Sequence, residues 1–314
     1  MIPEKSVIES KRGDYPLAEV QVQTEVRLSD ALFDHAVERL HATRLSPVAR
    51  CKVCGGEAHP FDILDFNKSC DCTLYPNGMS ATPVIYRLCS ECQFIFTDFY
   101  DTFTDEQWRS CVYNEEYLRI DPDYAEVRPR AHAREIIALL VGRKNNIIGL
   151  DYGGGNGMTT ALLREQGWSF DSYDPFGHSD MSPDRIGRYN FCSAMQVFEH
   201  TPDPVGTLRA IIEKSSPGRL MILIGTGTHD GIVSKKTRLS WWYAAPRNGH
   251  ISLYSRKSLQ ILCASFGLNC SSMSSGTFLL TRGIGEWSAR TLLLRGKLLR
   301  RLRSALNIWS GGLA

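Results

Sequence analysis

The pattern of apolar and polar positions changes at about residue 146. From there on, short apolar runs alternate with segments in which apolar residues recur every three or four positions, as in strands followed by helices. Strands are predicted at NIIGLDY, WSFDSYD, NFCSAMQVF, RLMILIG and SGTFLLTR, and helices at MTTALLREQG, VGTLRAIIEK and SRKSLQILCASFG. Strands and helices in alternation predict an α/β fold with a parallel, doubly wound, Rossmann-like sheet.

The residues before this point show no such alternation. The segment SDALFDHAVERLHA predicts a short amphipathic helix with Ser29 as its N-cap. Short strand-like pieces follow, and two further helices are predicted from Thr104 and from Pro129. The predicted domains are an N-terminal extension with a short helix (1–49), a cysteine-rich module (50–98), a helical connector (99–145), the α/β core (146–284) and a basic C-terminal tail (285–314).

Composition and charge exclude several classes of protein. A chain of 314 residues with 43% hydrophobic residues and a net charge of +2 is typical of a soluble globular protein. This balance lacks the basic excess of a nucleic-acid-binding protein. The first residues hold no apolar signal-peptide segment, and the longest apolar run, at residues 136–141, is too short to span a bilayer. We therefore expect a cytoplasmic protein.

The cysteines are unevenly distributed: six of the ten lie between Cys51 and Cys92. In a reducing compartment such a cluster indicates a metal site before disulfides. Two CxxC pairs, Cys51 with Cys54 and Cys89 with Cys92, resemble the hairpins of a zinc ribbon. Four thiolates at these spacings predict a closed, structural Zn²⁺ site. Two further cysteines, Cys70 and Cys72, lie between these pairs. They replace one pair, bind a second metal or stay as reduced thiols, and we favour reduced thiols.

A glycine-rich stretch, GLDYGGGNGMTT at residues 149–160, follows a predicted strand and opens a predicted helix. Its glycines let the backbone turn sharply and approach a ligand: Gly153, Gly154, Gly155 and Gly157. A phosphate-binding loop would end in GK[ST], and a dinucleotide fingerprint would need glycine where Met158 stands. The stretch instead fits D-x-G-x-G-x-G, with Asp151 at the end of the strand.

With this loop the sequence resembles the class I S-adenosylmethionine-dependent methyltransferases. The resemblance implies that the loop lies under the amino-acid half of the cofactor and that an acid after the second strand binds both ribose hydroxyls. Asp174, followed by Pro175, stands about 20 residues on, the separation that one strand–helix–strand unit produces. Its carboxylate accepts two hydrogen bonds at once. The stretch between Asp174 and the next strand is too short for the usual helix and strand that supply an adenine-binding acid, so the adenine contacts stay open.

The segment AMQVFEHTPDP resembles the segment after the third strand in a large group of methyltransferases that act on small molecules and sugars. The resemblance implies that four residues lie near the donor methyl group: Gln196, Val197, Glu199 and His200. Alternatively, Glu199 and His200 only cap the helix that Asp203-Pro204 begins. The [DNS]PP[YF] segment typical of nucleobase-amine methylases does not occur at this point.

The order of cysteine module, YNEEY segment and methyltransferase core is similar to that of the sugar methyltransferases of deoxysugar and surface-glycan pathways. This resemblance covers about Cys51 to Arg282. It implies that the zinc module packs on the core and helps to wall the sugar pocket, and that Tyr113 and Tyr117 face the active site.

The segment WWYAAPRNGHISLYSRKSL resembles the acceptor segment of the same family, in which a histidine serves as base. His250 falls on that histidine, and Gly249 replaces the preceding glutamate, which leaves the base without its support. Two aromatic residues of this segment, Trp242 and Tyr243, stack on a sugar face or pack in the core.

The sequence therefore predicts methyl transfer from S-adenosylmethionine to a hydroxyl of a sugar or glycan-type acceptor. His250 is the first candidate for the base and His200 the second, and purely positional catalysis is the alternative. The chain stops soon after the last core strand, where sugar C-methyltransferases carry another domain, so we expect O-methylation. Two alternatives stay open: a methyltransferase for another small metabolite, including sugar C-methylation, and a non-enzymatic, zinc-dependent nucleic-acid-binding protein.

The tail RTLLLRGKLLRRLRSALNIW holds six basic residues and no acid. An apolar stripe runs along its predicted helix: Leu294, Leu298, Leu302, Ala305 and Trp309. Either the stripe docks on the body of the protein, or it brings the enzyme to an anionic membrane, which suits a lipid-linked acceptor. Nucleic acid is the least favoured partner.

Overall fold

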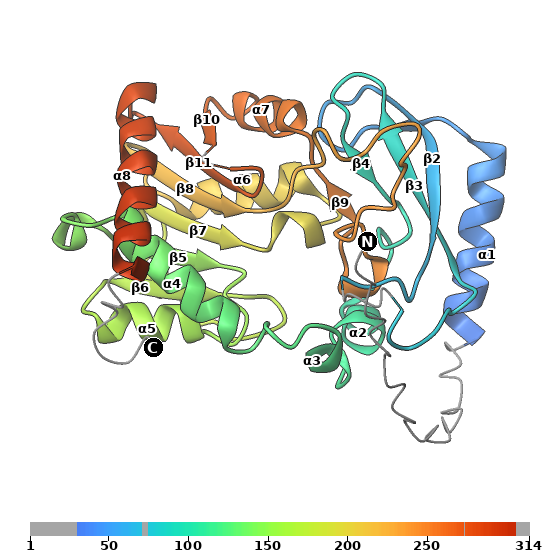
Figure 1. Ribbon diagram of the computed structural model, residues 1–314, viewed down its shortest axis with the longest axis horizontal. Coiled ribbons are helices and arrows are strands. Elements are labelled where there is room, and N and C mark those ends of the chain that lie inside the picture. Colours follow the sequence, from blue (N-terminus) through green and yellow to red (C-terminus); the bar gives the residue numbers. More distant parts are fainter. Residues whose placement is uncertain (1–29, 71–74, 273, 306–314) are drawn as a thin grey trace, which may run out of the picture.

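The computed structural model describes residues 30–70, 75–272 and 274–305, and two sheets organise them (Figure 1). One sheet builds the C-terminal core, and the other builds the cysteine-rich module beside it. The predicted cap Ser29, Cys72 and Trp309 lie outside the described residues.

A six-stranded mixed sheet forms the core, in the order β10-β11-β8-β7-β5-β6. Its strands are β5 (Gly149–Tyr152), β6 (Phe170–Tyr173), β7 (Phe191–Met195), β8 (Leu220–Gly225), β10 (Asn269–Ser272) and β11 (Thr277–Arg282). The neighbouring strands β6, β5, β7 and β8 are parallel, which confirms the predicted parallel sheet for this part.

At the other edge one predicted strand, β11, departs from the predicted parallel arrangement, and the sheet is mixed. Strand β11 is antiparallel to both β8 and β10. The link between β10 and β11 is too short for a crossover, so the chain turns back as a hairpin and β11 lies between β10 and β8. The sequence did not predict β10, because its residues NCSS have no alternation of apolar and polar positions.

Helices cover both faces of the core sheet. One face packs against α4 (Val127–Leu139), α5 (Met158–Glu165) and α8 (Glu286–Ala305), and the other against α6 (Pro204–Lys214) and α7 (Arg256–Ala264). The side chains of strand β8 alternate between the two faces. Met221 and Leu223 pack with the cluster of α4, α5 and α8, and Ile222 and Ile224 pack with the cluster of α6 and α7. A strand buried on both faces reads as a continuous apolar run, and the doubly wound fold is confirmed.

The connection between β6 and β7 contains only the short 3₁₀ turn η3 (Pro183–Arg185). The prediction that no helix and strand fit between Asp174 and the third strand is therefore confirmed. Strand β6 consequently forms an edge of the sheet.

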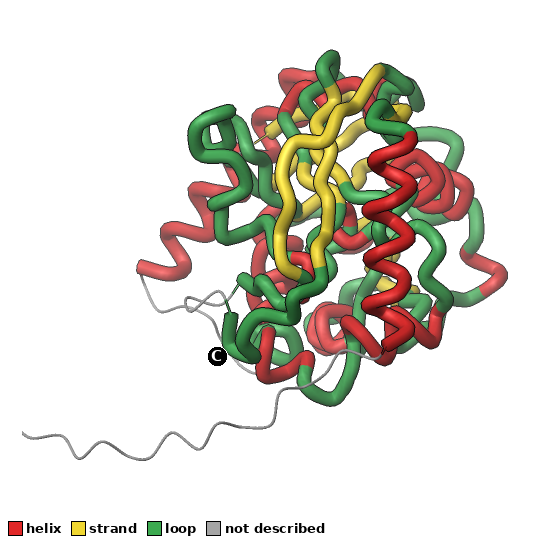
Figure 2. The backbone as a smooth tube through the Cα atoms, turned by 90° about the vertical axis from the view of Figure 1, so that its right-hand side faces the viewer, coloured by secondary structure: helices red, strands yellow, loops and turns green. Residues whose placement is uncertain are grey.

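The cysteine-rich module is a five-stranded antiparallel sheet in the order β1-β2-β3-β4-β9. Its strands are β1 (Ala49–Arg50), β2 (Glu57–Asp65), β3 (Pro83–Cys89), β4 (Ile95–Phe96) and β9 (Ser252–Leu253). Figure 2, seen from the module side, shows β2 and β3 as a long pair with α1 (Asp30–Leu45) alongside. Strand β9 comes from far along the chain, after β8, so the module sheet includes a segment of the core half.

The connector begins with α2 (Asp105–Gln107), whose N-cap is Thr104, as predicted. The Thr104 side chain and the Gln107 side chain bond to each other's backbone N–H groups in a capping box. A π-helical turn (η1, Trp108–Val112) and α3 (Tyr117–Ile120) follow in place of one continuous helix.

One hydrophobic cluster joins the module, the connector and the segment before β9. It contains Tyr86 of β3, Trp108 of the connector, and Trp241 and Ile251 from the later segment. These parts therefore fold against one another beside the core sheet. The predicted domain boundaries at residues 98 and 145 stay predictions.

Candidate active site

The glycine loop after β5 has the backbone that only glycine adopts easily. The φ angles of Gly153, Gly155 and Gly157 are +74°, +58° and +78°. The N–H of Gly153 donates to the Tyr173 carbonyl of β6 at 2.7 Å, which closes the turn between the two strands. A Cβ on Gly153 would lie 2.3 Å from a methyl of Val197, so the loops after β5 and β7 touch.

Asp174 lies at the end of β6 and holds this loop. Its Oδ2 accepts from the Gly155 N–H at 2.9 Å, and its Oδ1 accepts from the Phe176 N–H at 2.8 Å. Each carboxylate oxygen has a second lone-pair site, so both oxygens retain the capacity to accept from a ligand diol. Pro175 begins the exposed turn that follows.

Asp151 supports the loop from beneath. Its side chain is only 4% exposed, and its Oδ1 accepts from the Ser193 hydroxyl of β7 at 2.6 Å. Burial raises the pKa of this carboxyl to about 6. A Cβ on Gly154 would lie 3.0 Å from Asp151 Oδ2 and 2.4 Å from the Ser172 hydroxyl, so the loop rests directly on these polar groups. A part for Asp151 in binding the cofactor stays a prediction.

Gln196 follows β7 in a backbone conformation that is rare for a side chain with Cβ. Its φ is +57°, and its N–H donates to the Gly225 carbonyl of β8 at 2.8 Å. Strained residues of this kind concentrate at functional sites. The strain occurs where the carboxyl ends of neighbouring parallel strands meet, the usual ligand position in such sheets.

Glu199, His200 and His250 form a compact polar group beside these loops. One ligand atom from each side chain lies within 4.8 Å of the others. Glu199 is fully buried, and the burial raises its pKa to about 7. Burial also lowers the pKa of His250 to about 4 and that of His200 well below its ordinary value, so both imidazoles are neutral near pH 7. The structure thus brings together the two predicted candidates for the base, His250 and His200, and Glu199, while a catalytic part for each stays a prediction.

Local backbone contacts position the two segments of this group. Glu199 and His200 belong to the 3₁₀ turn η4 (Phe198–His200), and the Glu199 carbonyl accepts from the Ile251 N–H at 2.8 Å. The His250 carbonyl accepts from the Tyr86 hydroxyl of β3 at 2.8 Å. The module sheet therefore helps to hold His250 against the core.

The prediction that Gly249 leaves His250 unsupported is wrong. The His250 Nδ1 donates to the Tyr243 carbonyl at 2.8 Å, so a backbone oxygen replaces the expected glutamate. Gly249 has a φ of +81°, and a Cβ there would lie 3.1 Å from His200 Nδ1. Glycine at this position permits the close approach of the two histidine segments.

A series of aromatic rings in contact extends from His200 towards the glycine loop. The Tyr113 ring lies 6.3 Å from the His200 ring, 5.6 Å from Phe176 and 5.1 Å from Tyr117. Tyr117 in turn contacts Tyr124, whose hydroxyl lies 3.0 Å from a Cβ built on Gly155. Tyr113 therefore lies beside His200 and Tyr117 beside Tyr113, while their part in binding the acceptor stays a prediction.

Two residues of this aromatic series, Tyr124 and Phe176, were not predicted from the sequence. Both lie in turns without hydrophobic periodicity, so no pattern marked them. Their positions in the chain could have indicated them, because Phe176 follows Asp174 by two residues and Tyr124 shortly precedes the helix that begins at Val127.

Trp242 and Tyr243 have different surroundings. Trp242 is 55% exposed, and its predicted contact with the acceptor stays a prediction. Tyr243 is buried: its hydroxyl donates to Glu199 Oε1 at 2.6 Å and accepts from the Gly227 N–H at 3.1 Å. Its ring lies 4.2 Å from that of His250. These contacts make Tyr243 a positioning residue, in line with the core-packing alternative to sugar stacking.

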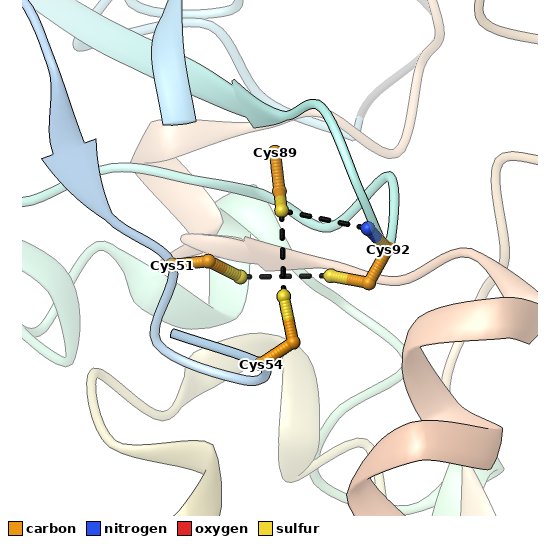
Figure 3. Close-up of side chains that lie close together, drawn as sticks. All are labelled: Cys51, Cys54, Cys89 and Cys92. Carbon is orange, nitrogen blue, oxygen red and sulfur yellow. Dashed lines mark hydrogen bonds between the residues drawn. The ribbon is translucent and has the colours of Figure 1, made fainter. Parts of the chain in front are cut away.

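The four cysteines of the two CxxC pairs converge in the module (Figure 3). Their sulfur atoms lie within 4.8 Å of one another, with Cys51 Sγ and Cys92 Sγ 3.5 Å apart, and Cys54 Sγ and Cys89 Sγ equally close. The structure confirms that these cysteines form one group. Four thiolates in one buried cluster have the chemistry of a structural zinc site.

The two hairpins of this cluster have matching backbones. The residue after each pair, Gly55 or Gln93, has a positive φ, of +74° and +61°. The Val53 N–H donates to Cys51 Sγ at 3.4 Å, and the Cys92 N–H donates to Cys89 Sγ at 3.5 Å. Such N–H donors favour the thiolate form that binds a metal.

Cys70 lies outside this cluster, so it replaces neither pair. Its Sγ is 3.5 Å from His250 Nδ1, and its backbone N–H donates to the Asn248 side chain at 2.8 Å. Burial raises the pKa of this thiol to about 12, so it stays protonated at neutral pH. Cys70 is a free cysteine, in agreement with the prediction that we favoured, a reduced thiol.

Part of the chain matches a known protein family. Residues 124–272 match the family of methyltransferase domains, whereas no curated protein sequence matches the chain. Among solved structures, it is similar to the plantazolicin methyltransferase BpumL in complex with SAH, at 14% identity and a TM-score of 0.40, over 61% of this chain and 86% of that one.

Two further structures are similar in the same way. One is the mitomycin 7-O-methyltransferase MmcR, at 13% identity and a TM-score of 0.37, over 53% of this chain. The other is an O-methyltransferase family protein from Burkholderia thailandensis, at 12% identity and a TM-score of 0.40, over 55% of this chain. This chain spans 59% of the mitomycin enzyme and 62% of the Burkholderia protein.

Residues 124–272 thus match a methyltransferase domain, and the doubly wound sheet that they help to build agrees with that match. A methyltransferase domain favours an enzyme over the non-enzymatic alternative.

Proposed function

We propose that this enzyme transfers the methyl group of S-adenosylmethionine to a hydroxyl of a sugar or glycan-type acceptor. The main support is the buried group of Glu199, His200 and His250, which lies beside the glycine loop at the carboxyl ends of the strands. A hydroxyl needs a polar group of this kind to lose its proton, because an alcohol is a poor nucleophile in its neutral form.

The cofactor site of this proposal follows the loops after β5, β6 and β7. With the cofactor bound, the loop at residues 153–157 would lie under its amino-acid half, and Asp174 would accept hydrogen bonds from the two ribose hydroxyls. Gln196 and Val197 would lie near the sulfonium, since the Val197 side chain approaches Gly153. When bound, S-adenosylmethionine supplies a methyl group on a positively charged sulfur, which keeps the electron pair of the broken S–CH₃ bond.

The acceptor enters between the row of aromatic rings and the histidines. Tyr113 and Tyr117, near His200, would bind its face, and the exposed Trp242, next to Tyr243, would contact it. His250 would take the hydroxyl proton as the acceptor oxygen bonds to the methyl carbon, and His200 is the second candidate for this part. The aromatic wall excludes water and aligns the acceptor, the main requirement of such a displacement.

A panel of acceptors tests this function. The enzyme with isotopically labelled S-adenosylmethionine should methylate nucleotide sugars or glycans, at a rate that salt hardly changes, and NMR of the product should show an O-methyl group. Labelling only of phenolic or other non-sugar metabolites would identify the alternative acceptor class, and a C-methyl product would disprove O-methylation. Salt-sensitive labelling of oligonucleotides alone would contradict the proposal.

We also propose that Cys51, Cys54, Cys89 and Cys92 bind one structural Zn²⁺ ion. The cluster is fastened to the core: the Ser255 hydroxyl donates to the Cys92 carbonyl at 2.7 Å, and His229 Nε2 donates to the Gln93 carbonyl at 2.8 Å. Buried residues of the cluster and of the core helix α7 belong to one hydrophobic group. Zinc would therefore stabilise the core as well as the module.

Cys51→Ser should remove the zinc, of which the unchanged protein should contain about one ion per chain. Because the module and the core share packing, the melting temperature should fall by roughly 10 °C or more. Elemental analysis and thermal unfolding measure both effects. Cys111→Ser, a half-buried cysteine outside the cluster, is the matched control. A folded, metal-free wild-type protein would disprove the zinc site.

We further propose that α8 brings the enzyme to an anionic membrane. Its Ala289, Leu292 and Leu293 are buried among residues of α4 and the sheet, whereas Leu294 and Leu298 are 69% and 59% exposed. Part of the predicted stripe thus faces outward among basic residues. None of the described helices has an apolar stretch long enough to cross a bilayer, so the contact would be peripheral.

A Leu294→Ser, Leu298→Ser double variant should bind vesicles that contain phosphatidylglycerol at least about tenfold more weakly, because it loses two apolar side chains from the contact. Co-sedimentation with these vesicles measures the effect. Ile63→Ser, which changes an equally exposed apolar residue on the module, serves as the control. Equal binding of the double variant and the wild type would show that the stripe has no such part.

A further inference from the structure

Two polar atoms at the centre of the active site lack partners. Glu199 Oε2 and His200 Nδ1 are both buried, and neither makes a hydrogen bond of normal geometry to the described residues. The Thr226 hydroxyl, which also lacks such a bond, approaches Glu199, and the backbones of Asn248 and Gly249 approach His200. An unsatisfied buried oxygen or nitrogen destabilises a folded protein, so each such atom needs an explanation. Both atoms belong to the compact group of Glu199, His200 and His250.

Tyr243 orients two members of this group at once. Its hydroxyl binds Glu199 Oε1, which leaves Oε2 as the unused oxygen of the carboxylate. Its carbonyl accepts from His250 Nδ1, so the proton of the neutral ring is on Nδ1 and the lone pair is on Nε2. Outer partners of this kind, which fix the tautomer of a histidine and the orientation of a carboxylate, are typical of metal ligands.

The dimensions of the group fit a single cation. Ligand atoms from the three side chains lie within 4.8 Å of one another. A cation bound at about 2.0–2.2 Å holds its ligand atoms at most about 4.4 Å apart, so small side-chain movements bring the three groups to coordination distance. Two imidazoles and one carboxylate suit a divalent transition metal and leave coordination positions open. The cysteine cluster differs in both respects, because four thiolates close its coordination sphere.

We propose that Glu199, His200 and His250 bind a divalent transition-metal cation with open positions for the acceptor. A cation here would neutralise the buried carboxylate and satisfy the atoms that lack partners. With the cation bound, His200 and His250 would act as its ligands in place of the base described above. The cation would lower the pKa of a hydroxyl that it binds, so that the hydroxyl loses its proton to water before it reacts. Binding of the metal stands on the geometry alone, whereas its part in the reaction rests on the proposed function.

A titration with Co²⁺ tests the site. The full-length protein is first loaded with zinc at the cysteines and washed with a weak chelator, and Co²⁺ is then added. We expect one Co²⁺ per chain, counted by elemental analysis after gel filtration, without the thiolate-to-metal absorption that cobalt at the cysteines would show. Zinc at the cysteine cluster should stay at one ion per chain throughout.

Glu199→Gln is the principal variant, because it keeps the size of the side chain and the oxygen that binds Tyr243 but removes the charge. It should weaken Co²⁺ binding at least tenfold, as should His200→Ala, while the zinc content and melting temperature of Glu199→Gln stay near those of the wild type. His59→Ala, an exposed histidine of the module, should bind Co²⁺ like the wild type. If His200→Ala does not fold, Glu199→Gln decides the result.

The proposal is overturned if the wild type binds no Co²⁺ beyond the cysteine cluster, or if Glu199→Gln binds it unchanged. Failure of the metal site and failure of the proposed function are distinguishable. Methylation of a sugar hydroxyl that is unaffected by chelation would leave the function and remove the metal. Tight Co²⁺ binding without methylation of any sugar would leave the metal site and remove the function.

Discussion

An Asp174→Ala enzyme is expected to bind S-adenosylmethionine at least about a hundredfold more weakly than the wild type. Two hydrogen bonds from the ribose to a carboxylate contribute about 1.5–3 kcal/mol each, and 1.4 kcal/mol corresponds to a factor of ten in affinity. The substitution also frees the N–H groups of Gly155 and Phe176, which Asp174 holds at 2.9 and 2.8 Å, so the glycine loop loses its anchor. Isothermal titration with S-adenosylhomocysteine measures the loss.

Two variants separate the effect on the ligand from the effect on the loop. Asp174→Asn keeps one side-chain oxygen for the loop but lacks the charge, so its affinity should lie between those of Asp174→Ala and the wild type. Asp184→Ala removes an exposed acid from the following turn and should change nothing. Near-normal affinity of Asp174→Ala would remove the ribose assignment.

A His250→Ala enzyme should lose turnover by a factor of about 10²–10³, while its affinity for the cofactor stays within about threefold. His250 lies on the acceptor side, between Tyr243 and His200, with ring distances of 4.2 and 4.8 Å. Either as base or as a ligand of the proposed cation, it acts on the acceptor hydroxyl and not on the cofactor. The measurement is kcat and KM for the acceptor, with cofactor binding determined separately.

Controls for this result address folding and the choice of histidine. Burial of His250 means that its removal leaves a cavity, so the melting temperature is recorded, and His250→Asn, which leaves a smaller cavity, repeats the test. His59→Ala on the exposed side of the module should retain full turnover. If His200→Ala alone lowers kcat, the base has been assigned to the wrong residue.

Local patterns in the sequence were sufficient for much of the core. The alternation of strand and helix patterns predicted the layers, because burial on two faces leaves a continuous apolar run such as Leu220–Gly225. Hydrogen bonding explains why Thr104 could be recognised as a cap, since its partner lies only three residues away. The polar strand Asn269–Ser272 carried no such pattern, and its place in the sheet depends on the neighbouring β11.

The candidate site divides in the same way. Gly153, Gly155 and Asp174 were predicted from the resemblance to class I methyltransferases together with their spacing, because one strand–helix–strand unit brings the two loops to the same edge of the sheet. The support of His250 was not predicted, since its partner is the backbone carbonyl of Tyr243, and a sequence does not show where a carbonyl points. Tyr124 and Phe176 were not predicted, because the turns that contain them show no regular spacing of apolar residues.

By itself, the sequence determined the class of fold, the glycine loop with its acid and the pairing of the cysteines, because these follow from periodicity and short spacings. Only the tertiary structure decided that β9 joins the module sheet, that Tyr243 orients both Glu199 and His250, and that Gly249 lets His200 approach. These contacts join residues far apart in the chain, and they arise from packing between segments that no local pattern encodes.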